Sequence, residues 1–288
     1  ICIFLNSIVI PKINKITYIN ISIMVVEQLI KANWLEKRPL SAFVIGFIYS
    51  LIAFLTSYVI FPSYFGIMSL AFLSVLLVPT LNKLLNIEEN QEIREKKFSI
   101  PQLLKDHYDI IEIYISIFLG IFLAYFLLIL FISPDLGVKL FSPQLDVAGI
   151  SGFAFYTANF WQILSNNLLV LVVAFILSLI YGAGAILFLS WNASVWGVVI
   201  GAVLRRTFGL ELLPITINFT QILPHLTIEA AGYILAAITG GILSKAVIRE
   251  RYKSKQFMHI LTDALLFGFL SAILILIAAF IEILLITA

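Results

Sequence analysis

The chain has 288 residues, of which 61% are hydrophobic and only 12% are charged, and its formal net charge is +2. A mean hydropathy of +1.08 lies far above the range of water-soluble domains. The nearly balanced charge gives no support for nucleic-acid binding. Cys2 is the only cysteine, which excludes an intrachain disulfide and a thiolate-rich metal site. The composition predicts an all-α, polytopic bundle of transmembrane helices whose first partner is the lipid bilayer.

The N-terminal part contains no predicted membrane crossing. Proline, lysine and asparagine break residues 1–23 into apolar pieces too short to span, and we expect Met24 to be the natural start. A native surface segment in the membrane interface is the alternative for 1–23. Residues 24–39 alternate apolar and charged residues, as an interfacial helix does, with Trp34 at headgroup depth.

The remainder, 40–288, is interpreted as a single transmembrane domain. Pro79 is expected to end the second span, because proline removes a helix hydrogen bond. About seven crossings are predicted, and six or eight remain open. The predicted spans are about 40–60, 67–81, 110–131, 168–181, 185–204, 227–247 and 259–286.

Polar or glycine-rich sequence separates these spans. Residues 83–109 carry most of the charge and are expected to form a solvated cytoplasmic loop. Residues 132–153, with two prolines and three glycines, are expected to be a connecting loop. Gly182, Ala183 and Gly184 offer a turn between the fourth and fifth spans.

Basic residues near the span ends set the expected orientation. With the N-terminus inside, the large majority of lysines and arginines are cytoplasmic. Lys139, Arg205 and Arg206 fall outside. For the arginine pair, either the side chains snorkel from the end of the fifth span to the outer headgroups, or a break near Asn192 makes that segment re-entrant and keeps the pair inside.

Polar and small residues recur in a fixed order through the C-terminal half: NNL at 166–168, small residues at 182–184, Asn192, Gly197 and Gly201, PH at 224–225, Glu229, and AAITGG at 236–241. This order resembles the stage II sporulation protein M family. The opening at 24–40 resembles the archaeal branch of that family. Leu226 and Ala193 stand where the family usually has glycine, which weakens the case for close backbone approach at those two positions.

The resemblance implies a non-catalytic membrane protein. Bacterial members anchor a pair of peptidoglycan-remodelling proteins during engulfment, whereas the archaeal branch implies no specific activity. The segment at 83–109 is then the expected docking surface for a soluble protein partner, although it can equally be a plain connector. A homo-oligomer is a further expected form.

His225 and Glu229 carry the sharpest chemical hypothesis in the sequence. They are four residues apart, so on a helix that starts after Pro224 they share a face. Such a pair can respond to protons or cations near the outer surface, or it can simply stabilise the helix start through the helix dipole. Two ligands are too few for zinc, so no metal site and no cofactor are expected.

Other polar residues extend this candidate cluster. Asn166 and Asn167 are expected to cap the fourth span, at the same outer level as His225, Glu229 and the arginine pair. Asp263 is expected to face water or Lys255 near the inner end of the last span. Glu282 has no neighbouring charge in sequence, so it needs a partner elsewhere, a proton, or access to the surface.

Small residues indicate helix packing rather than ligand binding. One face carries Gly197 and Gly201, and another carries Ala236, Gly240 and Ser244. The sequence has no Ser–His pair, metal triad or glycine-rich phosphate loop, so an enzyme is not expected. Two hypotheses remain for this multi-pass protein of the cell membrane: a scaffold or assembly factor, and a channel or transporter for a small ion or solute that uses the cluster around Glu229.

Overall fold

The computed structural model describes residues 39–91, 104–147, 159–207 and 219–287. The expected upstream segment and nearly all of the expected interfacial helix at 24–39 lie outside these ranges. Within them, every long element is a helix: α2 (Pro39–Ile60), α3 (Phe65–Gln91), α5 (Tyr108–Phe131), α6 (Pro134–Val147), α7 (Phe160–Tyr181), α8 (Ile186–Thr207), α9 (Phe219–Arg249) and α10 (Lys255–Thr287).

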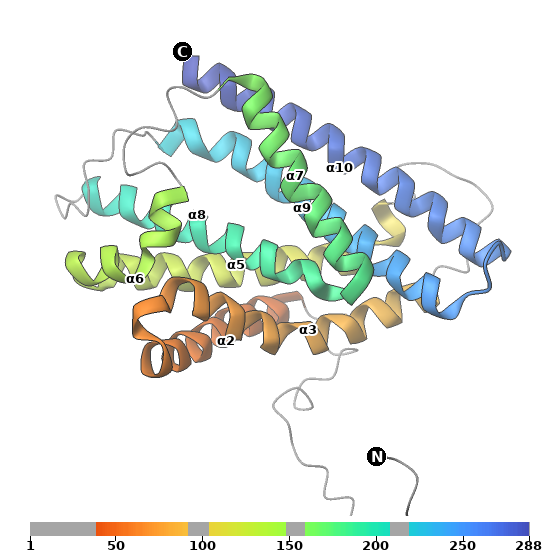
Figure 1. Cartoon of the computed structure of the whole chain (residues 1–288), viewed down its shortest axis with the longest axis horizontal. Coiled ribbons are helices and arrows are strands. Elements are labelled where there is room, and N and C mark those ends of the chain that lie inside the picture. The colour runs from red at the N-terminus through yellow and green to blue at the C-terminus, as the bar shows by residue number, and fades with distance from the viewer. Residues whose placement is uncertain (1–38, 92–103, 148–158, 208–218, 288) are drawn as a thin grey trace, which may run out of the picture.

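Seven of the helices in the described ranges are long and apolar enough to cross a membrane, and α6 is the exception. This confirms the expected all-α bundle of about seven spans. In Figure 1, α2, α3, α5 and α8 run alongside one another, and α7, α9 and α10 slope across them. Helix α9 packs against α10, α7, α3, α8 and α5, so it joins the two groups.

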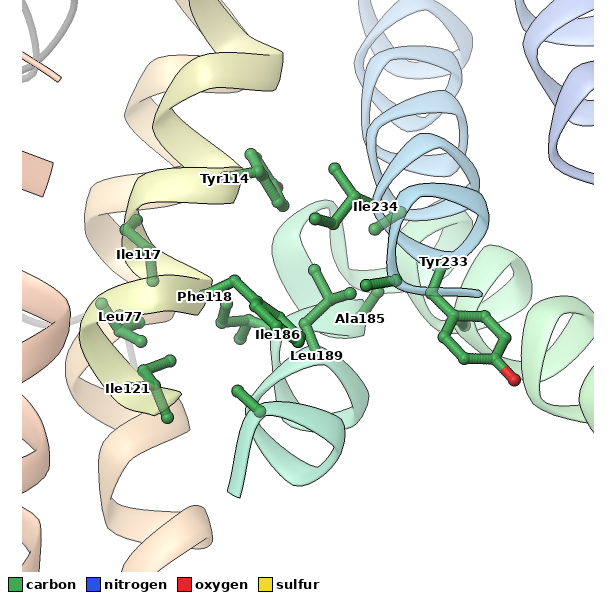
Figure 2. Packing of buried hydrophobic residues seen from close by; sticks show 14 of the residues in the cluster. Leu77, Tyr114, Ile117, Phe118, Ile121, Ala185, Ile186, Leu189, Tyr233 and Ile234 are labelled. Carbon is green, nitrogen blue, oxygen red and sulfur yellow. The ribbon is translucent and has the colours of Figure 1, made fainter. Parts of the chain in front are cut away.

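The apolar core lies where α5, α8 and α9 meet (Figure 2). Phe118 of α5 and Leu189 of α8 are buried there together with Ile234 of α9. In a bilayer such a core gains no hydrophobic driving force over lipid, so close van der Waals packing has to hold the helices together. Close approach of helix backbones at glycine therefore contributes more to helix association than the apolar area that is buried.

Glycines place pairs of helices in direct backbone contact. A Cβ atom on Gly197 would lie 2.6 Å from the carbonyl oxygen of Phe122, and one on Gly201 would lie 2.5 Å from Cγ2 of Ile129, both in α5. On α9, a Cβ on Gly240 would lie 2.6 Å from the carbonyl oxygen of Phe175 in α7. Both predicted small-residue faces therefore contain close contacts within one chain.

The other two members of the α9 face, Ala236 and Ser244, are buried. The sequence analysis missed a third close approach, between α2 and α5. Cβ atoms on Gly46 and Gly120 would collide with the backbone of Ile117 and Phe43. The small-xxx-small signal was nevertheless present, because Ala42 and Ser50 flank Gly46 at four-residue spacing, and Ser116 and Ala124 flank Gly120 in the same way.

The expected loop at 132–153 is wrong over most of its length, because α6 occupies Pro134–Val147. Its helix bends at Phe141, just before Pro143, and its exposed and buried residues still alternate at helical spacing, a periodicity that the sequence analysis missed. The side chain of Gln144 is buried and its Nε2 donates to the carbonyl oxygen of Gly66, 2.9 Å away. This hydrogen bond fixes α6 to the start of α3.

The expected interruption of the end of the second span by Pro79 is also wrong. Helix α3 continues through Pro79 to Gln91, so the charged segment at 83–109 begins in helix. It also ends in helix, since α5 starts at Tyr108. His107 is buried against the ring of Phe267, with ring centroids 4.9 Å apart, so this end of the segment packs on α10.

The expected turn after the fourth span is present at Gly182, whose φ of 70° suits glycine. Asn82 of α3 accepts a hydrogen bond from the backbone N–H of Ala183 at 3.1 Å, and Lys245 of α9 approaches Gly182. The turn is therefore held by side chains from two other spans, at the membrane side expected to be cytoplasmic.

The orientation predicted from the basic residues can be tested with single cysteines in a Cys2→Ser chain. Lys105 and Asp135 are both exposed, and they lie just before and just after α5, at its two opposite ends. An impermeant thiol reagent added to intact cells should label Asp135→Cys, and Lys105→Cys only after permeabilisation, because the basic residues favour the cytoplasmic side. The reverse labelling pattern would overturn the predicted topology.

The packing argument predicts unequal effects for two glycine-to-alanine changes. Gly197→Ala should lower the free energy of unfolding by about 1–3 kcal/mol, because its Cβ would press on the α5 backbone. Gly268→Ala on α10 is the control, since nothing lies within 4 Å of its Cβ. Reversible unfolding in mixed micelles measures both, and equal effects would contradict the contact.

Candidate functional site

Polar side chains from three spans meet in the half of the membrane that the predicted orientation places outside. Glu229 of α9 is 8% exposed, and its Oε1 accepts a hydrogen bond from Nδ2 of Asn167 in α7 at 2.5 Å. A buried polar group left without such a partner would be costly where water is excluded. It ties α7 to α9 at the candidate site.

The expected capping role of Asn166 and Asn167 is wrong. Helix α7 begins at Phe160, and Asn159 caps it in a capping box with Gln162. Asn167 therefore lies well inside the helix, where its side chain is turned towards α9 and is buried. Asn166 is exposed, and its Nδ2 is 3.5 Å from Oδ1 of Asn167. Only Asn167 reaches Glu229.

The helix-start interpretation of His225 and Glu229 is also wrong. Helix α9 begins at Phe219, so Pro224 lies inside it and Glu229 lies in its third turn, beyond the reach of the terminal dipole. His225 is buried one turn before Glu229, as the four-residue spacing predicts. The two residues share a helix face within the bundle.

Glu282 of α10 supplies the second carboxyl group of the site. Its charge interacts unfavourably with that of Glu229, and the Tyr233 side chain lies within the electrostatic reach of both. Glu282 is partly buried, and the three alternatives expected for it stay predictions. Tyr233 was missed by the sequence analysis, although its position four residues after Glu229 places it on the same face.

Arg205 does not join this group. It is 4% exposed, and its Nη1 donates to the carbonyl oxygens of Ile129, at 2.8 Å, and of Ile132. These carbonyls end α5, where a cation is favoured. Snorkelling to the headgroups is therefore wrong for Arg205. The side chain of Arg206 lies outside the described part of the structure.

The alternative of a broken fifth span is wrong as well. Helix α8 is continuous from Ile186 to Thr207, and Asn192 donates to the carbonyl oxygen of Phe188 one turn earlier, at 2.8 Å. A side chain that bonds its own intact helix satisfies itself without a ligand. Asn192 is thus separate from the Glu229 contacts.

Asp263 lies near the other end of α10. It is buried rather than facing water, and its Oδ2 is 3.4 Å from Nε2 of His259. The expectation of a water-facing carboxylate is wrong because α10 packs this face inwards. Among the described residues, no group of three or more histidine, cysteine, aspartate or glutamate side chains could hold a metal ion.

Comparison with known proteins gives one match. A sequence model of the family described as Stage II sporulation protein M matches residues 40–285, which includes all the spans described above. No curated protein sequence and no solved structure shows a significant match to the chain.

The contact between Asn167 and Glu229 predicts energetic coupling across α7 and α9. In a double-mutant cycle of Asn167→Leu and Glu229→Leu, we expect a coupling energy of about 0.6–1.7 kcal/mol from reversible unfolding. Ser165 provides the control, since it is exposed and bonds its own helix, and Ser165→Leu should be additive with Glu229→Leu. Additivity for Asn167→Leu too would show that the hydrogen bond contributes little.

Proposed function

Because the chain belongs to the stage II sporulation protein M family, we propose that it is a non-catalytic scaffold or assembly factor in the cell membrane. The proposal extends to this chain the anchoring role of the bacterial members. Seven membrane-capable helices in the described ranges make it a multi-pass membrane protein, as such an anchor requires.

The observation that carries the proposal is the use of polar side chains within the spans. Arg205 bonds the end of α5, Gln144 bonds the start of α3, and Tyr125 of α5 bonds Ser69 of α3 at 2.8 Å. Polar groups engaged in this way fix helices relative to one another. A rigid bundle with an unbroken α8 supports a structural role better than a helix-breaking transport cycle.

A scaffold also needs a surface in water, and α6 offers one. Its exposed residues Asp135, Lys139, Ser142 and Asp146 lie at helical spacing along one face. The opposite face is packed on the bundle. We propose this polar face as a docking surface for a protein partner on the outer side of the membrane. It is proposed in addition to the segment at 83–109 on the inner side. A second copy of the chain is the other partner that we propose.

Transport of a small ion is the second candidate function. The observation that favours it is the pair of carboxyl groups of Glu229 and Glu282 within the spans, since acidic residues inside membranes are costly and commonly serve ion or proton movement. The scaffold and the transporter differ in whether Glu229 and Glu282 line a water-filled path through the membrane.

Site-specific crosslinking in native membranes tests the scaffold. A photoreactive amino acid at Ser142 or at Lys105, both exposed, should give an adduct of uniform mass with a protein partner. The lipid-facing Val75, 68% exposed, provides the control and should give none. Asp135→Lys with Asp146→Lys should abolish the Ser142 adduct. Absence of a protein adduct from both positions would contradict the scaffold.

The scaffold proposal also predicts that the protein does not make vesicles permeable to ions. Liposomes that contain the full chain should leak protons and monovalent cations no faster than protein-free liposomes between about pH 5 and pH 8. A leak that Glu229→Gln alters would instead support the transport candidate.

A further inference from the structure

Positive charge gathers in the turn between α9 and α10. Residues 250–255 contain Arg251, Lys253 and Lys255, whereas Glu250 is the only acidic residue among them. All three basic side chains are exposed, while Glu250 is partly buried. None of the three forms an ion pair with another residue in the described ranges. Their charge is therefore available to a partner outside the chain.

The turn lies at the depth of lipid headgroups, because it joins two membrane-capable helices directly. Val247 and Ile248 near the end of α9 are exposed, and so is Met258 in the first turn of α10. In a bilayer these exposed apolar side chains face lipid. Figure 1 shows the turn at one end of the bundle, where α9 and α10 extend beyond the helices beside them. The basic residues follow the lipid-facing ones within a few positions, so they reach the level of the lipid phosphates.

The backbone of the turn has a defined shape that does not favour lysine. The N–H of Ser254 donates to the carbonyl oxygen of Arg251 at 2.8 Å, which closes a four-residue turn and keeps the two Cα atoms within about 7 Å. Lys253 occupies the third position of this turn with a φ of 64°, where glycine or asparagine is usual. Turn geometry therefore does not explain a lysine at this position, whereas a need for positive charge does.

An aromatic ring completes the surface. The ring of Tyr252 is exposed, lies 5.4 Å from Nζ of Lys253 and packs on the ring of buried Phe257, with centroids 5.7 Å apart. Ser254 caps α10 by accepting a hydrogen bond from the N–H of Phe257 at 3.0 Å. A tyrosine ring with a polar tip is favoured at headgroup depth. The turn thus combines a fixed backbone, an interfacial aromatic ring and exposed cations.

We propose that the turn at 250–255 binds the phosphate of an anionic lipid headgroup. The guanidinium of Arg251 offers paired N–H donors to the phosphate oxygens, and the ammonium groups of Lys253 and Lys255 add point charges. The acyl chains of the lipid lie along the exposed apolar residues at the end of α9. Phosphate line both surfaces of a bilayer, so the site is compatible with either orientation of the chain and is independent of the scaffold role.

Charge complementarity selects the class of lipid. A zwitterionic headgroup carries its own cation, which offsets the phosphate and leaves the three basic side chains unbalanced. Free phosphate in water has no acyl chain to cover the apolar residues beside the turn. An anionic phospholipid satisfies both the charged and the apolar part of the surface.

Native mass spectrometry of the full chain in a neutral detergent tests the site. The protein is titrated with phosphatidylglycerol or with phosphatidylcholine that has the same acyl chains. We expect the first phosphatidylglycerol to bind more than about tenfold more tightly, because each basic residue near an anionic lipid contributes about fivefold. Equal affinity of the wild type for the two lipids would overturn the proposal.

Charge-neutralising variants locate the site. Lys253→Asn removes one charge and suits the positive φ, so it should keep the turn and weaken phosphatidylglycerol binding about fivefold. Arg251→Gln with Lys255→Gln should bring the affinity for phosphatidylglycerol close to that for phosphatidylcholine. If this double variant fails to fold, Lys253→Asn carries the test.

The matched control neutralises two exposed lysines elsewhere, Lys83→Gln with Lys105→Gln, and should leave the affinity for the first phosphatidylglycerol within about twofold of the wild type. An equal loss in the control would show that general surface charge attracts the lipid and would exclude a site at the turn. An excess of ammonium phosphate should not displace the lipid. Displacement would identify a site for soluble anions and overturn the assignment to lipid.

Discussion

The membrane requires every polar group in a span to be satisfied inside the protein, and the rest of the structure follows from this requirement. Arg205 is the clearest case, because a buried guanidinium finds its acceptors in the backbone carbonyls that end α5. Gln144 satisfies the same requirement at the start of α3. Polar residues that bond another helix in this way specify which helix is their neighbour, whereas Asn192 bonds its own helix.

Glycine allows this arrangement to be dense. Gly197 and Gly201 bring α8 onto the backbone of α5, and Gly240 brings α9 onto α7. Since lipid is as apolar as the core, contact distance decides which helices associate. Helix α9 takes part in contacts with both groups of helices, which is why its polar residues end up at an interface rather than in lipid.

The candidate site departs from this rule in one respect. Arg205 and Gln144 donate to backbone carbonyls, whereas Glu229 and Glu282 place two acidic side chains within the spans. A bundle that only needed stability would gain by replacing either acid with an apolar residue.

The sequence by itself determined the all-α membrane class, the number of spans, the turn at Gly182 and the small-residue faces. Each of these follows from local hydrophobicity or local spacing, which the chain carries without reference to its neighbours. Only the tertiary structure decided the partners of Asn167 and Arg205, because a buried polar side chain is satisfied by whichever span packs beside it. The errors at α6 and at the start of α7 have the opposite cause, since the helical spacing of the exposed residues of α6 and the capping box of Asn159 and Gln162 are local signals that the sequence carries.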